Sequence, residues 1–223
     1  EQIYGGAAMP GGTGYEPPFP SRQTERVEQK AAIGRKAAEL VNDGDTVALD
    51  VGTTTLELAR NLRGKKGIVV VTASTQIALE LVGYEGINVI IAGGVIRPKE
   101  LSVVGDIAVD TFKRFFVDKA FLGAAGVTLE QGVSDYNTED TNVKRTIISR
   151  AKETILLVDS RKVGKVAFAW VCPADNLRAI VTDWEVDRDC IPRFERQGVK
   201  VLVAEATAAD LPGKIDDSPG DSE

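Results

Sequence analysis

The chain has 223 residues, of which 43% are hydrophobic and 27% charged, so it is long enough to bury a substantial core. Its net charge is −6 and it has no long basic stripe, so this chain is a poor candidate for binding the phosphate backbone of a nucleic acid by itself. Histidine is absent, which excludes His-based zinc sites and Ser-His-Asp triads, and we expect no metal, no cofactor and no catalytic residue.

Cysteine usage and hydropathy suggest the compartment. Cys172 and Cys190 are too few for a disulfide framework and too far apart for a CxxC metal site. No apolar run approaches the roughly 20 residues of a membrane span, and the N-terminus lacks the pattern of a signal peptide. We therefore expect a cytoplasmic protein with no membrane partner.

In the first half of the chain, helical and strand patterns alternate. Residues 1–22 are rich in glycine and proline, and they predict a linker without regular elements, pinned by its aromatic side chains. Helices are then expected at 23–42, 54–62 and 74–81, and strands at 46–51, 68–72 and 87–92. Because these strands are apolar on both faces, they predict a parallel sheet covered by helices on each side.

The second half is less regular. We expect helices at 107–115, 139–152 and 188–197, a strand with its exit loop at 117–127, and strands at 153–159, 178–183 and 199–204. The short pieces at 95–104 and 163–177 predict a small antiparallel subdomain. The predicted fold is therefore a doubly wound, mostly parallel α/β domain over 23–204 with a small additional α+β subdomain, followed by a disordered acidic tail at 205–223.

The segment LDVGTTT (49–55) carries the strongest local signal. A hydrophobic strand ends at Asp50, Gly52 allows a tight turn, and Thr53, Thr54 and Thr55 open a helix. Backbone N–H groups at a helix start, together with threonine hydroxyls, form a cradle suited to a monophosphate. The alternative is an ordinary helix cap, for which threonine is also well suited. Neither GxxxxGK[ST] nor GxGxxG occurs here, so this is not one of the familiar nucleotide loops.

Further candidate residues lie where other predicted strands end. In a parallel sheet the carboxyl ends share one rim, so loops there converge on one crevice. These loop candidates are Thr72, Ser74, Gly93, Gly94, Gly123 and Gly126, although the glycine pair would also suit a simple turn. Lys144 and Lys162 are candidate cations for a phosphate. Glu139 suits either sugar hydroxyls or the helix dipole, and Asp118 lies at a strand edge.

Taken in order, these pieces resemble the C-terminal sensor domain of the DeoR family of transcriptional regulators. The resemblance covers about residues 23–204, through DGDTVALDVGTTTLELARNL, VVVTAS, IIAGGVIRP, VGDIAVD, VDKAFLGAAGV, VKRTIISRA, LLVDSRKVG and AIVTD. Each piece is weakly diagnostic, but their common order is highly specific. The opening YGGAA resembles the segment that follows the winged helix-turn-helix in this family, which implies that this DNA-binding domain is missing here.

The resemblance implies a fold similar to that of ribose-5-phosphate isomerase, glucosamine-6-phosphate deaminase and CoA transferases. It also implies a phosphorylated sugar as effector, operator DNA bound only through the missing domain, and a homo-oligomeric repressor. The positions that match the family's pocket pattern are Asp50, Gly52, Thr53, Thr54, Thr55, Gly93, Gly94, Asp118, Gly123, Gly126, Lys144 and Lys162. The family commonly has Thr-Asn after the second strand, whereas Ala73 follows Thr72 here, which puts one polar contact in doubt.

Two other classes are compatible with parts of the pattern. A sugar-phosphate isomerase or deaminase would need a carboxylate base and a polarising cation, which Asp50, Asp118, Glu139 and Lys144 could supply. However, the segment after GAAG lacks the glycine-rich, lysine-containing loop of the isomerases, and a deaminase would need a histidine. A nucleotide-binding Rossmann protein would need a glycine fingerprint that the sequence lacks. The sequence therefore favours a sensor over an enzyme.

Overall fold

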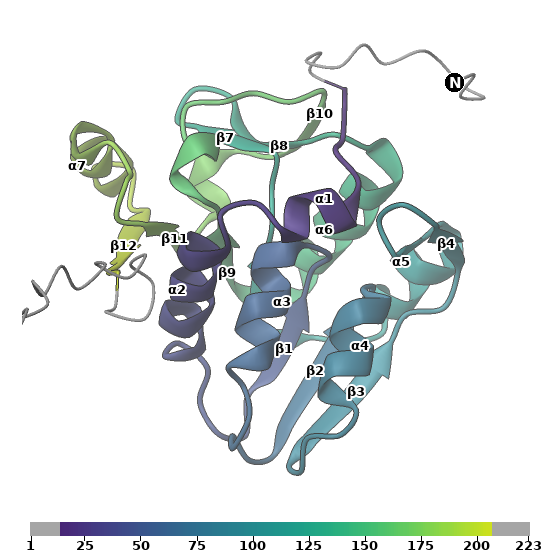
Figure 1. The fold of residues 1–223 in the computed structure, drawn as a ribbon. Coiled ribbons are helices and arrows are strands. Elements are labelled where there is room, and N and C mark those ends of the chain that lie inside the picture. Colours follow the sequence, from purple (N-terminus) through teal and green to yellow (C-terminus); the bar gives the residue numbers. More distant parts are fainter. Residues whose placement is uncertain (1–13, 207–223) are drawn as a thin grey trace, which may run out of the picture.

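The computed structural model describes residues 14–206 (Figure 1). Most of the predicted linker and nearly all of the predicted tail lie outside these residues. The first elements are α1 (Phe19–Gln23), α2 (Val27–Ala38), β1 (Thr46–Leu49), α3 (Thr53–Arg60), β2 (Ile68–Thr72), α4 (Thr75–Leu81), β3 (Ile87–Ile91), β4 (Val95–Arg97), β5 (Ser102–Val104) and α5 (Asp106–Lys113). They are followed by β6 (Val117–Leu122), β7 (Gly126–Thr128), β8 (Gly132–Asp135), α6 (Thr138–Arg150), β9 (Ala151–Leu157), η1 (Ser160–Lys162), β10 (Ala169–Cys172), η2 (Ala174–Asn176), β11 (Ala179–Asp183), η3 (Arg188–Cys190), α7 (Ile191–Glu195) and β12 (Lys200–Ala204).

A seven-stranded parallel sheet forms the centre of the molecule, in the order β12-β11-β9-β6-β1-β2-β3. The chain builds β1, β2 and β3 outward in one direction. It then returns to the other side of β1 to form β6 and, further out, β9, β11 and β12. The strand order therefore reverses between β1 and β6, and in open α/β sheets such a point is where ligands bind.

Helices cover both faces of this sheet, as predicted. In Figure 1, α2, α3 and α4 lie side by side over one face, and their buried residues pack with Val47 and Leu49. The buried residues of α5 and α6 belong to a second core on the other face, which includes Ala48. Successive residues of β1 thus serve opposite cores, which explains why this strand is apolar throughout.

Two regions differ from the prediction. The predicted linker contains a short helix, α1, whose Phe19 is buried in the core beneath α2 and α3. The predicted antiparallel subdomain is instead two separate sheets: the β4-β5 hairpin, and a three-stranded sheet in the order β10-β8-β7. In the second sheet, β7 begins within what was expected to be an exit loop, and no element was predicted at the position of β8.

The close approach of α2 and α3 depends on Gly34. A Cβ atom built at Gly34 would lie 2.5 Å from the backbone carbonyl carbon of Glu57, much closer than side chains tolerate. Only glycine therefore lets the two helices pack at this separation. This contact holds α3 against α2 and so fixes the direction in which the first turn of α3 faces the rim of the sheet.

Candidate functional site

The candidate site lies at the carboxyl edge of the sheet, above the point where the strand order reverses. Asp50 directly follows β1, and Gly123 directly follows β6. The backbone N–H of Gly123 donates to Asp50 Oδ2 at 2.9 Å, so the two loops are joined to each other. The predicted convergence of these two loops is thus observed in the structure.

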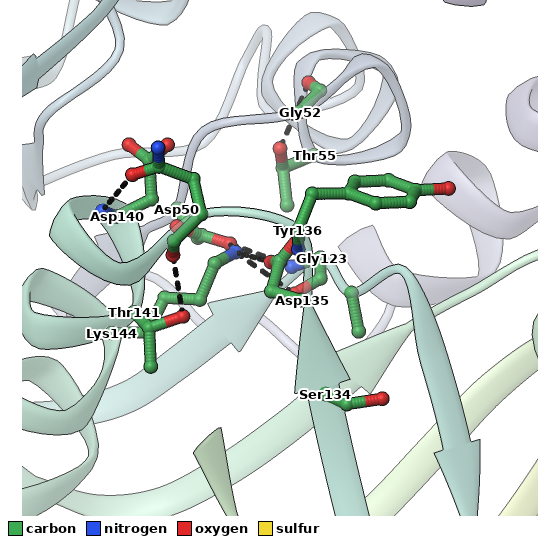
Figure 2. A network of polar contacts seen from close by, with 12 residues as sticks. Asp50, Gly52, Thr55, Gly123, Ser134, Asp135, Tyr136, Asp140, Thr141 and Lys144 are labelled. Carbon is green, nitrogen blue, oxygen red and sulfur yellow. Dashed lines mark hydrogen bonds and ion pairs between the residues drawn. The ribbon is translucent and has the colours of Figure 1, made fainter. Parts of the chain in front are cut away.

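A buried ion cluster joins these loops to α6. The Lys144 ammonium contacts the carboxylate of Asp50, lies 3.0 Å from Asp135 Oδ2, and donates to the carbonyl oxygen of Gly123 at 3.0 Å (Figure 2). Lys144 and Asp50 are each only 3% exposed. All three hydrogens of the ammonium group therefore have acceptors, as a buried charge requires.

Burial and charge act against each other in this cluster. Burial opposes the charged form of Lys144, but the carboxylates of Asp135 and Asp50 outweigh it and raise the pKa of Lys144 above its ordinary value. Burial raises the pKa of the Asp50 carboxyl, against the attraction of Lys144. Lys144 is therefore a permanent cation held in place by two carboxylates.

The first turn of α3 forms one wall of the site. Thr53 and Thr54 line a pocket, and their hydroxyls have no hydrogen-bond partner among the described residues. No side chain caps this helix, so its first N–H groups also face the pocket. Thr55 differs, because its buried hydroxyl donates to the carbonyl oxygen of Gly52 at 2.9 Å. Two of the three predicted threonines are therefore free to bind an anion.

Charged side chains form the rest of the pocket. Asp135, Asp140, Lys144 and Lys162 line it from the loops and helices that follow β8 and β9. Residues of other segments complete the lining: Glu16, Arg22 and Glu100. Val51, Ala124 and Leu157 add a smaller apolar part to the lining. The site is consequently mostly polar, which suits a hydroxylated, charged ligand better than an apolar one.

Ion pairs hold the N-terminal segment against this pocket. Arg22 contacts the carboxylate of Glu100, and Arg97 contacts Asp140 while donating to Glu16 at 2.8 Å. Burial raises the pKa of Glu100 to about 7, although the attraction of Arg22 opposes this rise. The segment before α2 is therefore attached to the rim in part through Glu100, whose charge can change near neutral pH.

Several predicted site residues have other roles in the structure. The Thr72 hydroxyl donates to the carbonyl oxygen of Leu49 at 2.7 Å, and Ser74 caps α4 by accepting from the N–H of Ile77. Glu139 is exposed in the first turn of α6 and does not line the pocket, whereas the neighbouring Asp140 does. These polar side chains are satisfied by local structure.

The predicted glycines divide in a similar way. Gly52 and Gly123 line the pocket. Gly94 has a φ of 138° and lies so close to β5 that a Cβ atom would be 2.4 Å from the Val104 carbonyl oxygen. A Cβ atom on Gly126 would lie 2.3 Å from the carbonyl oxygen of Lys165. Gly94 and Gly126 thus serve close backbone packing, and Gly93 lies beside Gly94 away from the pocket.

The prediction that Asp118 belongs to the pocket is corrected by the structure, because Asp118 lies at the opposite edge of the sheet. It is the second residue of β6, whereas the pocket lies beyond the strand's last residue. Its Oδ2 accepts from the backbone N–H of Thr46 at 3.0 Å and from the Thr46 hydroxyl at 2.7 Å. Its Oδ1 accepts from Lys152 at 2.6 Å. Asp118 therefore joins the amino ends of two strands and is not part of the pocket.

Sequence reasoning missed several residues of the pocket. Asp135 and Tyr136 follow a strand that was not predicted, and Glu16 and Arg22 lie in the segment expected to be a linker. A buried-strand pattern at 132–135 would have indicated the first pair. Ala73, where the family commonly has asparagine, is buried in the core beneath α5 and does not line the pocket.

Residues 14–206, the part of the chain that the structure describes, contain neither a candidate membrane-spanning helix nor a candidate metal site. No helix there is long and apolar enough to cross a membrane. No group of three or more acidic or cysteine side chains in the same residues has the arrangement of a metal site.

A parallel sheet with a charged, polar pocket at its carboxyl edge defines an α/β ligand-binding domain. A family model described as the DeoR C terminal sensor domain matches residues 25–184. The chain belongs to this family. This confirms the resemblance found in the motifs.

Two relatives illustrate the match. The HTH-type transcriptional regulator GolR of Listeria innocua is 29% identical over 205 residues, which are 92% of this chain and 81% of the relative. The glycerol-3-phosphate regulon repressor of Escherichia coli is 29% identical over 180 residues, 81% of this chain and 71% of the relative. These relatives are named as regulators of transcription, and the prediction of a regulator rather than an enzyme is confirmed.

Two solved structures show similarity at low sequence identity. The eIF2B delta structure from Chaetomium thermophilum has a TM-score of 0.53 and 15% identity, covering 70% of this chain and 56% of that chain. Ribose 5-phosphate isomerase A from Methanocaldococcus jannaschii has a TM-score of 0.44 and 20% identity, covering 60% of this chain and 53% of that chain. This chain thus spans about half of each. The similarity to eIF2B delta shows a shared fold and nothing more.

Proposed function

We propose that this chain is the effector-sensing domain of a repressor of carbohydrate metabolism and that its effector is a phosphorylated sugar. The effector binds in the pocket at the carboxyl edge of the sheet, between the first turn of α3 and the ion cluster of Lys144. Its binding changes how the full-length protein binds operator DNA.

The observation that carries the proposal is the free first turn of α3. The hydroxyls of Thr53 and Thr54 and the uncapped N–H groups beside them all face one charged pocket. A helix start of this kind favours a phosphate group, through both its free donors and its dipole. Asp135 and Asp140 offer carboxylate oxygens to hydroxyl groups in the same pocket.

The relatives support the rest of the proposal. One is named for a glycerol-3-phosphate regulon, which fits a phosphorylated polyol as the effector class. Another is named an HTH-type regulator, so we assign operator binding to a helix-turn-helix domain and not to this acidic chain. We also propose a homo-oligomer, because symmetric operators are bound by symmetric proteins, and a cytoplasmic location.

An isomerase of similar fold remains the alternative, and the structure disfavours it. Asp50 and Lys144, its candidate base and cation, are locked to each other in a buried cluster. Asp118 lies at the other edge of the sheet, and Glu139 points away from the pocket lining. No pair of these groups is therefore placed to move a proton on a ligand in the pocket.

The test is a thermal-shift screen of phosphorylated pentoses, hexoses and polyols, each beside its unphosphorylated parent. A ligand at about 100 times its Kd stabilises the folded state by about 2.7 kcal/mol, which gives a clear rise in Tm. We expect at least one phosphorylated compound to raise Tm while its parent does not. If parent sugars stabilise the protein as well as their phosphates do, the phosphate is not recognised and the proposal fails.

A further inference from the structure

A second hollow lies next to the pocket and is strongly basic. It has a volume of about 190 Å³ and shares Arg22, Thr53, Tyr136 and Lys162 with the pocket. We name it the basic hollow after the cationic side chains that line it: Arg22, Lys30, Arg161, Lys162 and Lys165. Because Thr53 faces both spaces, the start of α3 separates two compartments of one continuous cleft.

The two compartments carry opposite charge. Five cations and two carboxylates, Glu25 and Asp159, line the basic hollow. Three cations and four carboxylates line the pocket, where Lys144 is paired with Asp135 and Arg22 with Glu100. In the basic hollow Arg161 is paired with Glu25 and Asp159, which leaves Lys30, Lys162 and Lys165 without a salt bridge among the described residues. An anionic group is consequently attracted to the basic hollow and repelled from the far end of the pocket, where Asp135 and Asp140 lie.

Two lysines of the basic hollow are buried or partly buried without a carboxylate partner. Lys30, in the first turn of α2, is 5% exposed, and its ammonium donates to the carbonyl oxygen of Arg22. Lys162, at the end of η1, donates to the carbonyl oxygen of Ala124 at 2.8 Å. Within residues 14–206 neither forms a salt bridge, so each ammonium keeps two of its three hydrogens for another acceptor.

This arrangement is costly in the absence of a ligand. Burial lowers the pKa of Lys30 to about 8, and the nearby charge of Lys162 lowers it further. Burial also lowers the pKa of Lys162. The Asp159 carboxylate lines the same hollow and partly offsets the effect of burial on both lysines, but its salt bridge is with Arg161. Two buried or partly buried ammonium groups with free hydrogens in a polar space are the arrangement that an incoming anion would stabilise.

We propose that the basic hollow is the subsite for the anionic group of the effector, held by Lys30, Lys162 and the start of α3 at Thr53. The effector then lies along the cleft with its phosphate in the basic hollow and its hydroxyl groups toward Asp135 and Asp140 in the pocket. This inference rests on the proposed function, adds the orientation of the ligand and the binding residue Lys30, and assigns Lys162 to the anionic group.

The probe for this subsite is inorganic phosphate, which needs no knowledge of the sugar. Tm is measured near pH 7 in phosphate at about 20 mM and in chloride of equal ionic strength, so that screening is matched. We expect phosphate to raise the Tm of the wild type. Lys30→Met and Lys162→Met should each weaken this effect by about tenfold in apparent affinity, since each removes charged hydrogen bonds to the anion.

Lys36→Met is the matched control, because Lys36 lies on the same helix as Lys30 but is exposed and paired with Glu39. It should respond to phosphate like the wild type. Lys30→Met should be at least as stable as the wild type without phosphate, because it removes a buried cation that has no carboxylate partner. A weaker phosphate response in Lys30→Met therefore cannot be attributed to unfolding.

Two outcomes would overturn the inference. One is a wild type that does not respond to phosphate, and the other is a response that both lysine variants retain in full. The same variants are then titrated with the best phosphorylated sugar from the thermal-shift screen. If both lysine variants bind this sugar with unchanged affinity, the basic hollow is not the anion subsite. The proposed function would then still be supported by Thr53 and Thr54. A failed sugar screen alongside an intact phosphate response would reject the proposed function alone.

Discussion

The two edges of the central sheet both carry an aspartate paired with a lysine, but in different surroundings. At the carboxyl edge, Lys144 and Asp50 are each 3% exposed and form a closed cluster with Asp135. At the amino edge, the Asp118 side chain pairs with Lys152, whose side chain is 75% exposed. Solvent therefore screens the second pair and hardly reaches the first.

This difference shows that residue type alone does not define a site. Both pairs join segments that are distant in sequence, and both aspartates lie beside strands of the same sheet. The carboxyl-edge pair faces an uncapped helix start and a pocket, whereas the amino-edge pair links two strand ends. What separates them is their position along the strands, because only the carboxyl ends open onto the crevice.

The largest expected effect is on folding, from removing the buried cation. Lys144→Met leaves Asp50 and Asp135 buried without a partner, and breaking a buried ion pair in this way costs about 3–5 kcal/mol. The free energy of unfolding, measured by urea titration, should fall by that amount near pH 7. Part of the loss should be recovered as the pH falls, because burial raises the pKa of the Asp50 carboxyl and its protonated, neutral form needs no cation.

Lys152→Met is the control at the other edge, where the side chain is exposed and solvent screens the ion pair, so the change should cost far less than Lys144→Met. Equal losses in the two variants would remove the distinction between the edges.

The second prediction concerns the threonines at the start of α3. Replacing both Thr53 and Thr54 with valine removes two hydroxyls that face the pocket, each worth roughly 1.5–3 kcal/mol toward a charged group. Affinity for the phosphorylated effector, measured by calorimetric titration, should fall at least about tenfold. Thr55→Val is the matched comparison, since that hydroxyl is already bound to Gly52. It should lower stability by about 1 kcal/mol and leave affinity unchanged. The reverse pattern would mean that Thr53 and Thr54 only cap the helix.

The third prediction concerns the pH dependence of the pocket rim. The pKa of Glu100 rises from an ordinary 4.5 to about 7 through burial, so the folded state holds this proton more tightly than the unfolded chain. Stability from this group is complete below about pH 4.5 and is lost as the pH rises through 7. The unfolding free energy of the wild type should therefore fall between pH 5 and 7.5, and in Glu100→Gln this fall should be smaller. If the variant and the wild type keep the same slope, Glu100 does not titrate in this range.

The smallest effect is expected at the amino edge, with the opposite direction in pH. Hydrogen bonds from Lys152 and Thr46 hold the pKa of the Asp118 carboxyl well below its usual range. Its contribution is therefore present above its ordinary value of 3.8 and is lost as the pH falls further. Asp118→Asn should reduce the acid-induced loss of stability below pH 4 and leave effector affinity at pH 7 unchanged. A changed effector affinity in Asp118→Asn would mean that Asp118 contributes to the binding site after all.

Much of the fold was predictable, because buried parallel strands and their covering helices have distinct sequence patterns. The strand at Thr46–Leu49 and the strand at Ile68–Thr72 were located to within two residues at each end. The short strands β7 and β8 were missed, because pieces of three or four residues are too short to show a period. α1 was missed because proline and glycine around it obscured the single buried anchor, Phe19.

The candidate site was only partly predictable. Asp50, Thr53, Thr54 and Lys144 were found because they follow strands or open helices in the expected way. Asp118 was included because it matches the family's pocket pattern, although it is the second residue of its strand and so lies at the strand's amino end. Lys30 carried no signal in the sequence, since a lysine in an amphipathic helix is normally exposed and its burial depends on the loop that packs over it.

The ion pairs of Arg22 and Glu16 have a thermodynamic consequence. Both residues belong to the segment before α2, and both line the pocket. A ligand that binds differently to the docked and displaced positions of this segment must change the balance between them. Linkage is reciprocal, so anything that pulls the segment away changes the affinity for that ligand by the same factor. For such a ligand, a force applied to the chain ahead of Phe19 would thus change the affinity of the pocket. The molecule that exerts the force would not need to contact the pocket itself.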